Sequence, residues 1–499
     1  MKKIVFGVLI GLFCFKDLTA QRYYEFSPMA RQAYREIMSL RFEKAISSLD
    51  ALKQGEPDNL TRIFLENYLE VLWIGVEDDE TAYKRLSDNM DKRLYQLSRG
   101  EPRSPYYRYT QAEVRLQWAV LRARFGDELA CLNDVKQAYA LLEENNRRFP
   151  DFMANKKSLG VLHALVGNVP DEYRWTVRLL SGMRGSIEEG LAELASVVLY
   201  AKTHDFVFAD ETLILYTMLL AQLNNQPDKA WSILQSGNLD TGKNPLSAFA
   251  FAHLAIRSGH NDRAIKILSD LPRGDDYHPL HYADFLLGVA RLHSLDENAQ
   301  MPLLRFVDNF SGKNGLKEAY QKLAWNQLLR GNANGYFEYM KQVKLRGVAR
   351  SDPDKAALRE ANSGEMPDGL LLKTRLLFDG GYYSRAYDLL KNAGGRYDTD
   401  SRNKLEYLYR MGRITQQMGK RELAQSYFKQ TIELGEKRPW YFACNAALQL
   451  GIMKELVLDV QSARVWFKKC LSIQPEEYAT SLHAKAKAGL NRIRRLADD

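Results

Sequence analysis

One short stretch carries the residue types that bind a phosphate group. Residues 237–244 read GNLDTGKN and match the pattern G-x-x-x-x-G-K-[ST] except at the last position, where Asn244 replaces the hydroxyl residue. The pattern needs an apolar strand before the glycine loop and a helix after it. Here the helix-forming stretch KAWSILQS precedes the loop, and Pro245 follows Asn244 directly. We therefore predict a turn between two helices and no bound nucleotide.

A pair of histidines is the second candidate for chemistry. Of the eight His residues, only His278 and His281 lie close together, in DDYHPLHYAD. A zinc site needs two further ligands, which Asp275 and Asp276 would have to supply from the same loop. Pro279 instead favours the first turn of a helix. We therefore predict a polar helix start, with no metal and no cofactor.

Two motifs of hydrolytic enzymes do not occur in the sequence. It contains neither HExxH nor the nucleophile elbow GxSxG. The acids Asp78, Asp79 and Glu80 lie together, but such clusters are typical of helix caps and solvated turns. We therefore predict that the protein is not an enzyme, and keep an envelope enzyme of unrecognised type as one alternative.

The composition indicates an all-helical protein. The chain has 499 residues, of which 45% are hydrophobic and 26% charged, so it can bury a large core. With 32 Gly and 15 Pro, helix breakers are fewer than average, and the helix formers Leu and Ala recur throughout. These features predict an all-α fold.

The N-terminus has the parts of an export signal. Lys2 and Lys3 precede an apolar run at residues 4–15, and Leu18-Thr19-Ala20 ends on a small residue. The run is shorter than the roughly 20 residues of a membrane span, so an uncleaved anchor is the minor alternative. We predict a signal peptide at residues 1–20 and a periplasmic protein, with association with the outer membrane as a further expectation.

The chain after residue 20 is weakly basic. Removing residues 1–20 takes away three Lys and one Asp and lowers the formal charge from +8 to +6. This charge permits loose contact with an anionic membrane surface but lacks the dense basic stripe of a nucleic-acid binder. The remaining cysteines, Cys131, Cys444 and Cys470, have no motif spacing and are expected to be small buried residues.

The clearest periodic pattern lies near the C-terminus, in LEYLYRMGRITQQMGKRELAQSYFKQTIELGEK from Leu405. Small residues at Gly412 and Ala424 would let two antiparallel helices approach closely, while Phe428 fills the space beside them. The pattern returns 39 residues later, since Ala463 follows Ala424 at that distance. The second copy contains Ala447, Leu450, Gly451, Ala463, Phe467, Cys470 and Pro475.

These positions resemble the tetratricopeptide repeat (TPR). The preceding window repeats the spacing at Gly381, Ala386 and Leu390, and weaker copies include Ala45 and Ala264. The resemblance implies an α-solenoid, a superhelix of TPR-like helical hairpins, with about 11 or 12 pairs at roughly 38 to 40 residues each.

The chain is also remotely similar to the eukaryotic inclusion-body clearance and tetratricopeptide-repeat 39 family. The similarity lies in Leu159-Gly160, GNVPDEYRW and LLLKTRLLFDGGYYSRAYDLL from Leu370. It implies a helical-repeat scaffold and brings no catalytic residue with it.

Two stretches interrupt the helical rhythm, SRGEPRSPYYRYTQAE from Ser98 and VARSDPDKAALREANSGEMPDG from Val348. We expect the second to be a hinge, with a boundary near residue 360. The predicted organisation is a signal peptide, divergent TPR-like repeats, C-terminal TPR repeats and a capping helix, at residues 1–20, 21–360, 361–475 and 476–499.

The capping helix is predicted to be amphipathic. Its apolar face would cover the core of the last repeat and consists of Leu482, Ala486, Leu490, Ile493 and Ala497. The opposite face is either solvated or contacts an acidic protein or anionic lipid head groups; it carries Lys485, Lys487, Arg492, Arg494 and Arg495.

The first helices of the C-terminal repeats are expected to form a concave surface. Tyr and Arg on such a surface suit an extended peptide, although an ordinary wet surface is the alternative. The candidate partner-binding residues are Glu406, Tyr409, Arg413, Gln416, Asn445 and Glu455. We therefore predict a non-catalytic scaffold that binds or organises proteins in the cell envelope. A glycan-binding protein of the outer membrane is the first alternative.

Overall fold

The computed structural model describes residues 22–167, 182–398 and 401–498. Within these ranges the regular structure consists of 25 α-helices and two short 3-10 helices, besides one isolated bridge between Tyr23 and Asn59. The prediction of an all-α fold is confirmed. The predicted signal peptide and the NVPDEYRW part of the central turn, residues 168–175, lie outside the described residues.

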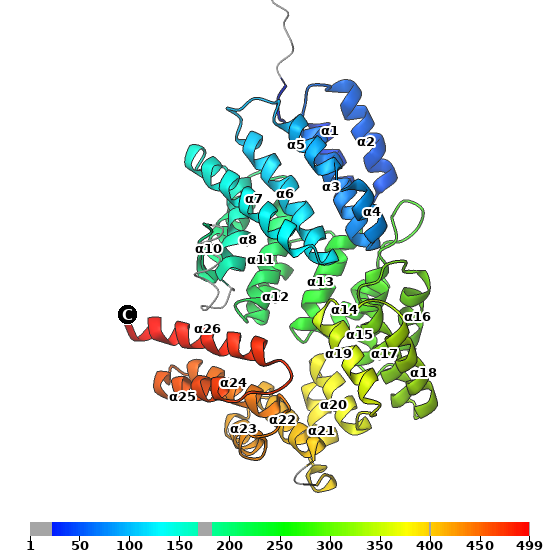
Figure 1. Cartoon of the computed structure of the whole chain (residues 1–499), viewed down its shortest axis with the longest axis vertical. Coiled ribbons are helices and arrows are strands. Elements are labelled where there is room, and N and C mark those ends of the chain that lie inside the picture. The colour runs from blue at the N-terminus through cyan, green and yellow to red at the C-terminus, as the bar shows by residue number, and fades with distance from the viewer. Residues whose placement is uncertain (1–21, 168–181, 399–400, 499) are drawn as a thin grey trace, which may run out of the picture.

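The first half of the chain folds into helices that contact their neighbours in sequence (Figure 1). They are α1 (Pro28–Met38), α2 (Phe42–Gly55), α3 (Thr61–Glu77), α4 (Glu80–Leu86), α5 (Asn89–Leu97), α6 (Pro105–Phe125), α7 (Glu128–Arg148), α8 (Met153–Gly167), α10 (Ile187–Ala201), α11 (Ala209–Gln222), α12 (Pro227–Gln235) and α13 (Pro245–Arg257).

The second half of the chain also consists of helices, and it ends in a long terminal helix (Figure 1). Its helices are α14 (Asn261–Ser269), α15 (His281–His293), α16 (Gln300–Asn309), α17 (Leu316–Leu329), α18 (Ala333–Leu345), α19 (Asp352–Ser363), α20 (Gly369–Asp379), α21 (Tyr383–Leu390), α22 (Arg402–Gln417), α23 (Arg421–Gly435), α24 (Phe442–Glu455), α25 (Val460–Ser472) and α26 (Ala479–Asp498). The buried apolar residues form successive clusters in chain order, from α1–α8 to α22–α26.

The close helix approach predicted near the C-terminus is confirmed. A Cβ atom added at Gly412 would lie 2.6 Å from the Phe428 ring, and one at Gly451 would lie 2.5 Å from the Phe467 ring. Ala424 on α23 is fully buried. Since any side chain at the two glycines would push the aromatic ring away, α22 packs on α23 in the same way as α24 packs on α25.

The stretch from Val348 is partly regular, because it contains helix α19. Ser351 caps this helix by accepting a hydrogen bond from the Asp354 N–H, and Pro353 stands in its first turn. Ala357 and Ala361 are buried against the cluster that includes α17 and α18. Residue 360, where the boundary was expected, lies within α19. The stretch from Ser98 likewise becomes helical at Pro105, so its three tyrosines lie on α6.

GNLDTGKN forms the loop between α12 and α13, as predicted. Asp240 accepts hydrogen bonds from the N–H groups of Gly242 and Lys243, at 3.1 and 3.0 Å. Asn244, at the place of the missing hydroxyl residue, caps α13 by accepting from the Ser247 N–H. A helix precedes the loop instead of the strand that the phosphate-binding pattern needs.

A buried ionic network ties together the helices of the first half. The Lys157 ammonium group is 2% exposed and lies 2.7 Å from a carboxylate oxygen of Glu211 and 3.3 Å from one of Glu113. Tyr34 and Tyr68 donate their hydroxyl protons to Glu211 at 2.8 and 2.6 Å. Burial raises the pKa of Glu211, but Lys157 outweighs it, and the pKa lies below its usual range.

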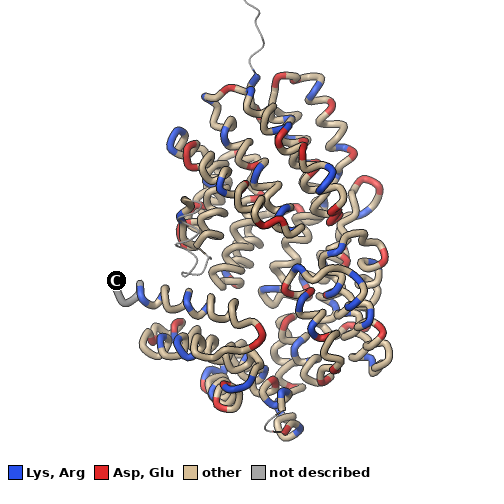
Figure 2. Tube along the Cα trace, in the orientation of Figure 1, with Lys and Arg blue, Asp and Glu red and all other residues tan. Residues whose placement is uncertain are grey.

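The capping helix α26 covers the last hairpin, as predicted. Leu482, Ala486 and Ile493 are buried in one cluster with α24 and α25, and Leu490 packs against it. The side chains of Arg495 and Ala497 lie outside the described part of the chain. Figure 2 shows basic residues along α26, whereas Lys, Arg, Asp and Glu are interspersed over the rest of the chain.

Candidate functional site

A groove of about 1000 Å³ lies in the second half of the chain. Six helices line it, namely α17, α19, α20, α22, α24 and α26. The lining has nearly equal numbers of basic and acidic residues, together with the aromatic residues Trp325, Phe378, Tyr409, Tyr441 and Tyr478. A surface of this composition offers charge pairs and aromatic contacts along its length.

Four of the six predicted binding residues line this groove, namely Glu406, Tyr409, Arg413 and Asn445. Gln416 and Glu455 are not among the lining residues. Glu455 instead accepts two hydrogen bonds from the guanidinium group of Arg492 on α26, at 2.6 and 2.8 Å. The side chain of Glu455 is therefore engaged in holding the capping helix.

Two arginines neutralise Glu406 inside the groove. Arg410 donates to the Glu406 carboxylate from Nε at 2.9 Å and from a terminal nitrogen at 2.6 Å, and Arg402 lies 3.4 Å from it. Burial alone would raise the pKa of Glu406, but the two guanidinium groups outweigh it and place the pKa below its usual range. Glu406 is therefore a fixed anion that orients Arg402 and Arg410.

The Tyr409 hydroxyl oxygen joins the two adjacent hairpins. It accepts a hydrogen bond from Arg413 on the same helix at 3.1 Å, and another from the Asn445 side chain on α24 at 2.7 Å. The Arg413 guanidinium group also lies over the Phe378 ring, with 5.0 Å to its centroid. These contacts hold Arg413 in one orientation at the groove.

The wall made by α17 and α19 was missed by sequence reasoning. Glu360 on α19 accepts hydrogen bonds from Gln321, Trp325 and Tyr336, at 2.6, 2.7 and 3.1 Å. Lys322 stands 4.0 Å from the centroid of the Trp325 ring. Burial lowers the pKa of Lys322. The polar stretch from Val348 gave no periodic signal for this wall, since only Ala357 and Ala361 of α19 belong to the core.

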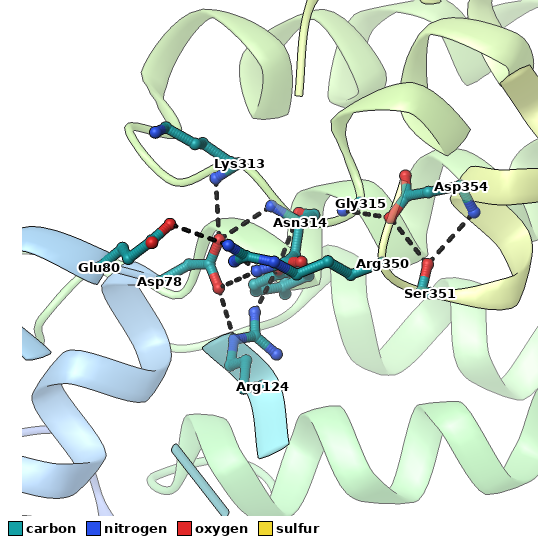
Figure 3. Close-up of polar contacts among 10 residues, drawn as sticks. Asp78, Glu80, Arg124, Lys313, Asn314, Gly315, Arg350, Ser351 and Asp354 are labelled. Carbon is teal, nitrogen blue, oxygen red and sulfur yellow. Dashed lines mark hydrogen bonds and ion pairs between the residues drawn. The ribbon is translucent and has the colours of Figure 1, made fainter. Parts of the chain in front are cut away.

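A buried carboxylate fixes this wall to the N-terminal helices (Figure 3). Asp78, at the end of α3, is fully buried and accepts hydrogen bonds from the N–H groups of Lys313 and Asn314, at 2.8 and 2.9 Å, and from the Asn314 side chain at 2.8 Å. Arg124 on α6 donates to it at 2.5 Å. We call these four residues the Asp78 hub. Because residues 313–314 lead into α17, the hub positions one side of the groove.

A second carboxylate continues the hub toward α19 (Figure 3). Asp354 is buried and accepts hydrogen bonds from the N–H groups of Gly315 and Glu318 at the start of α17, at 3.0 and 3.1 Å. Arg350, just before α19, pairs with Glu80 on α4 at 3.2 Å. These contacts therefore fix the positions of α17 and α19 relative to each other and to α4.

The other residues that the sequence singled out for chemistry, the histidine pair and the cysteines, make contacts within the fold. The His278 imidazole contacts the Glu77 carboxylate at 2.6 Å, and the backbone N–H of His278 donates to the Leu40 carbonyl at 2.7 Å. Among the described residues, no three His, Cys, Asp or Glu side chains are placed to hold a metal ion. Cys444 and Cys470 are buried as predicted, with sulfur atoms 3.6 Å apart, whereas Cys131 is half-buried.

Comparison with known proteins finds no matching family model and no curated protein of significant similarity. Over the described ranges, no helix is both long enough and apolar enough to cross a membrane. Within the groove, Glu406 pairs with Arg402 and Arg410, and Arg375 pairs with Asp379.

Proposed function

We propose that the protein is an exported, TPR-like α-solenoid that binds or organises other proteins in the cell envelope and has no catalytic activity. The observation that carries the proposal is the groove of about 1000 Å³, which is lined by α17, α19, α20, α22, α24 and α26 and contains both paired charges and aromatic rings. An extended peptide presents both polar groups and apolar side chains at short intervals, which this mixture complements.

The equal spacing of Gly412–Phe428 and Gly451–Phe467 supports the TPR-like part of the proposal, since both pairs pack a small residue on a large one. The export signal at residues 1–20 supports the envelope location. The pairing of Glu406 with Arg402 and Arg410 supports a binding role, because a carboxylate held by two guanidinium groups is a poor acceptor of protons.

Photo-crosslinking in the native envelope tests this function. A photoreactive amino acid is placed at Ser481, an exposed residue of the groove, and in a control variant at Lys429, an exposed residue of α23 that does not line it. We expect a discrete crosslinked protein, identified by mass spectrometry, from position 481 only. Equal products from both positions, or none from position 481, would contradict binding through the groove.

Glycan binding is the second candidate, because Tyr478 at the groove is 41% exposed, beside Tyr441 and with the Arg359 guanidinium group over its ring, and aromatic and guanidinium groups together can contact a sugar. A screen of envelope glycans against the purified chain tests it. Binding that is lost in Tyr478→Ala would favour this candidate over a protein partner.

A further inference from the structure

Two cysteine side chains meet inside the last helical hairpin. Cys444 lies in the first turn of α24 and Cys470 in the last turn of α25, and both are fully buried. Their Sγ atoms are 3.6 Å apart, so the two sulfur atoms are in contact. A disulfide bond has an S–S length of about 2.0 Å, and rotations about the two Cα–Cβ bonds can close a gap of this size.

The packing of the hairpin holds the two thiols together. Gly451 on α24 lies against Phe467 on α25 so closely that an added Cβ atom would be 2.5 Å from the ring. This close approach of the two backbones is what a disulfide requires, because it bridges Cα atoms less than about 7 Å apart. The cysteines lie at the end of the hairpin opposite the turn that joins α24 to α25. A bond between them therefore closes the open end of the hairpin.

The third cysteine of the described chain lies elsewhere. Cys131 is on α7, which is in a separate part of the molecule from α24 and α25 (Figure 1), and its side chain is half-buried. The odd number of cysteines after residue 20 thus consists of one adjacent pair and one single thiol. A zinc ion would need further ligands beside the pair, and no group of three His, Cys, Asp or Glu suited to a metal occurs over the described ranges.

We propose that Cys444 and Cys470 form a disulfide bond that locks α24 to α25. The reaction is thiol–disulfide exchange with a small-molecule or protein disulfide. One cysteine thiolate attacks the external disulfide, forms a mixed disulfide and releases one thiol, and the second cysteine thiolate then displaces the other thiol. The two cysteines are oxidised, and the external disulfide is reduced to two thiols that take up the two protons.

The capping helix α26 covers the pair and controls its access. Sγ of Cys470 lies 3.9 Å from the carbonyl oxygen of Leu482 on α26, and Leu482 is buried in the same cluster as both cysteines. The oxidant therefore reaches the thiols while the hairpin folds or when α26 lifts from it. Once formed, the buried bond is shielded from reducing thiols in the same way.

The bond goes beyond the proposed function, because it needs no partner protein, but it acts on the wall of the groove. Tyr441 and Asn445 line the groove on either side of Cys444 in the sequence, and Tyr478 and Ser481 line it shortly after Cys470. A covalent link between α24 and α25 therefore ties two lining segments together. The inference rests on the proposed export only for its oxidising compartment.

Peptide mapping by mass spectrometry tests the bond. The full chain is incubated with glutathione disulfide, one sample folded throughout and one refolded from urea. We expect a linked peptide pair that contains Cys444 and Cys470 and that dithiothreitol separates, whereas Cys131 stays a thiol or takes up one glutathione. In Cys470→Ala the linked pair should be lost. Recovery of both cysteines from both samples as thiols, or as separate glutathione adducts, would overturn the inference.

Hydrogen exchange then tests whether the bond fits the packed hairpin. A disulfide that spans 26 residues restricts the opened chain, so amide exchange in α25 should be at least about tenfold slower in the oxidised wild type than in the reduced one. Cys470→Ala is the matched control and should exchange equally under both conditions. Equal or faster exchange in the oxidised wild type would overturn the proposed lock.

The chain isolated from the native envelope separates this inference from the proposed export. We expect a chain cleaved after Ala20 that contains the Cys444–Cys470 bond. A cleaved chain with both thiols reduced would overturn the disulfide and leave the export standing. An uncleaved chain with reduced thiols would overturn the export and, with it, the source of the oxidant.

Discussion

Replacing Asp78 tests whether the contact between the N-terminal helices and the groove wall contributes as much stability as its geometry indicates. In Asp78→Ala, the N–H groups of Lys313 and Asn314, the Asn314 amide and the Arg124 guanidinium group lose their common acceptor in a fully buried position. Removing one partner of a buried charge pair costs about 3–5 kcal/mol. Asp78 also has a left-handed backbone with φ 54°, which Ala adopts at a further cost of about 1 kcal/mol.

We therefore expect Asp78→Ala to lower the free energy of unfolding by about 4–6 kcal/mol. Urea unfolding followed by circular dichroism measures this change. Asp79→Ala is the matched control: it removes the same charge from the next residue, but Asp79 only caps α4 by accepting from Thr81 and Ala82, which is worth about 1 kcal/mol. If the two variants differed by less than about 1 kcal/mol, the hub would not be the strong contact described here.

Three further variants test other parts of the structure. Ala424→Glu places a charge in a fully buried site between α22 and α23 and should destabilise the chain by at least about 3 kcal/mol in urea unfolding; a negligible change would refute the helix packing. Lys157→Met leaves two buried carboxylates without their cation and should cost about 3–5 kcal/mol, part of which Glu211→Gln in the same chain should restore. Burial lowers the pKa of His293 from 6.5 to about 4, so the folded state disfavours its protonation, and the penalty grows as the pH falls from 6.5 to 4. The wild type should therefore lose about 3 kcal/mol over this range that His293→Gln retains, and parallel losses in the two proteins would show that His293 is not buried in its neutral form.

Local features of the fold, such as helix starts and the packing of two adjacent helices, were predictable from the sequence because a few nearby residues determine them. Gly412 and Phe428 sit at positions that can only pack small against large, and the structure brings them together. Asn244 and Pro245 mark the start of a helix by their chemistry alone, and the structure uses both in that way. The helical class also followed from composition.

The parts that were missed depend on residues far apart in the chain. Helix α19 is mostly polar because one face lines the groove, so its sequence lacks the apolar periodicity that identifies a buried helix. The partner of Glu455 was likewise not predictable from the sequence. Glu455 belongs to the expected helix, but the distant Arg492 on α26 takes up its carboxylate. Pairings of this kind depend on how whole hairpins are placed, which spacing within one hairpin does not specify.

The contacts between distant segments also bear on how the chain unfolds. Helical hairpins that touch only their neighbours can fray one at a time from either end. Here Asp78 bonds to residues 313–314 and Leu40 accepts a hydrogen bond from His278, across more than 200 residues of chain. Such links close long loops, so they form late in folding and join separate hairpins into one cooperative unit. Hydrogen exchange should therefore show the helices between these contact points opening together, while α22–α25 exchange independently of them.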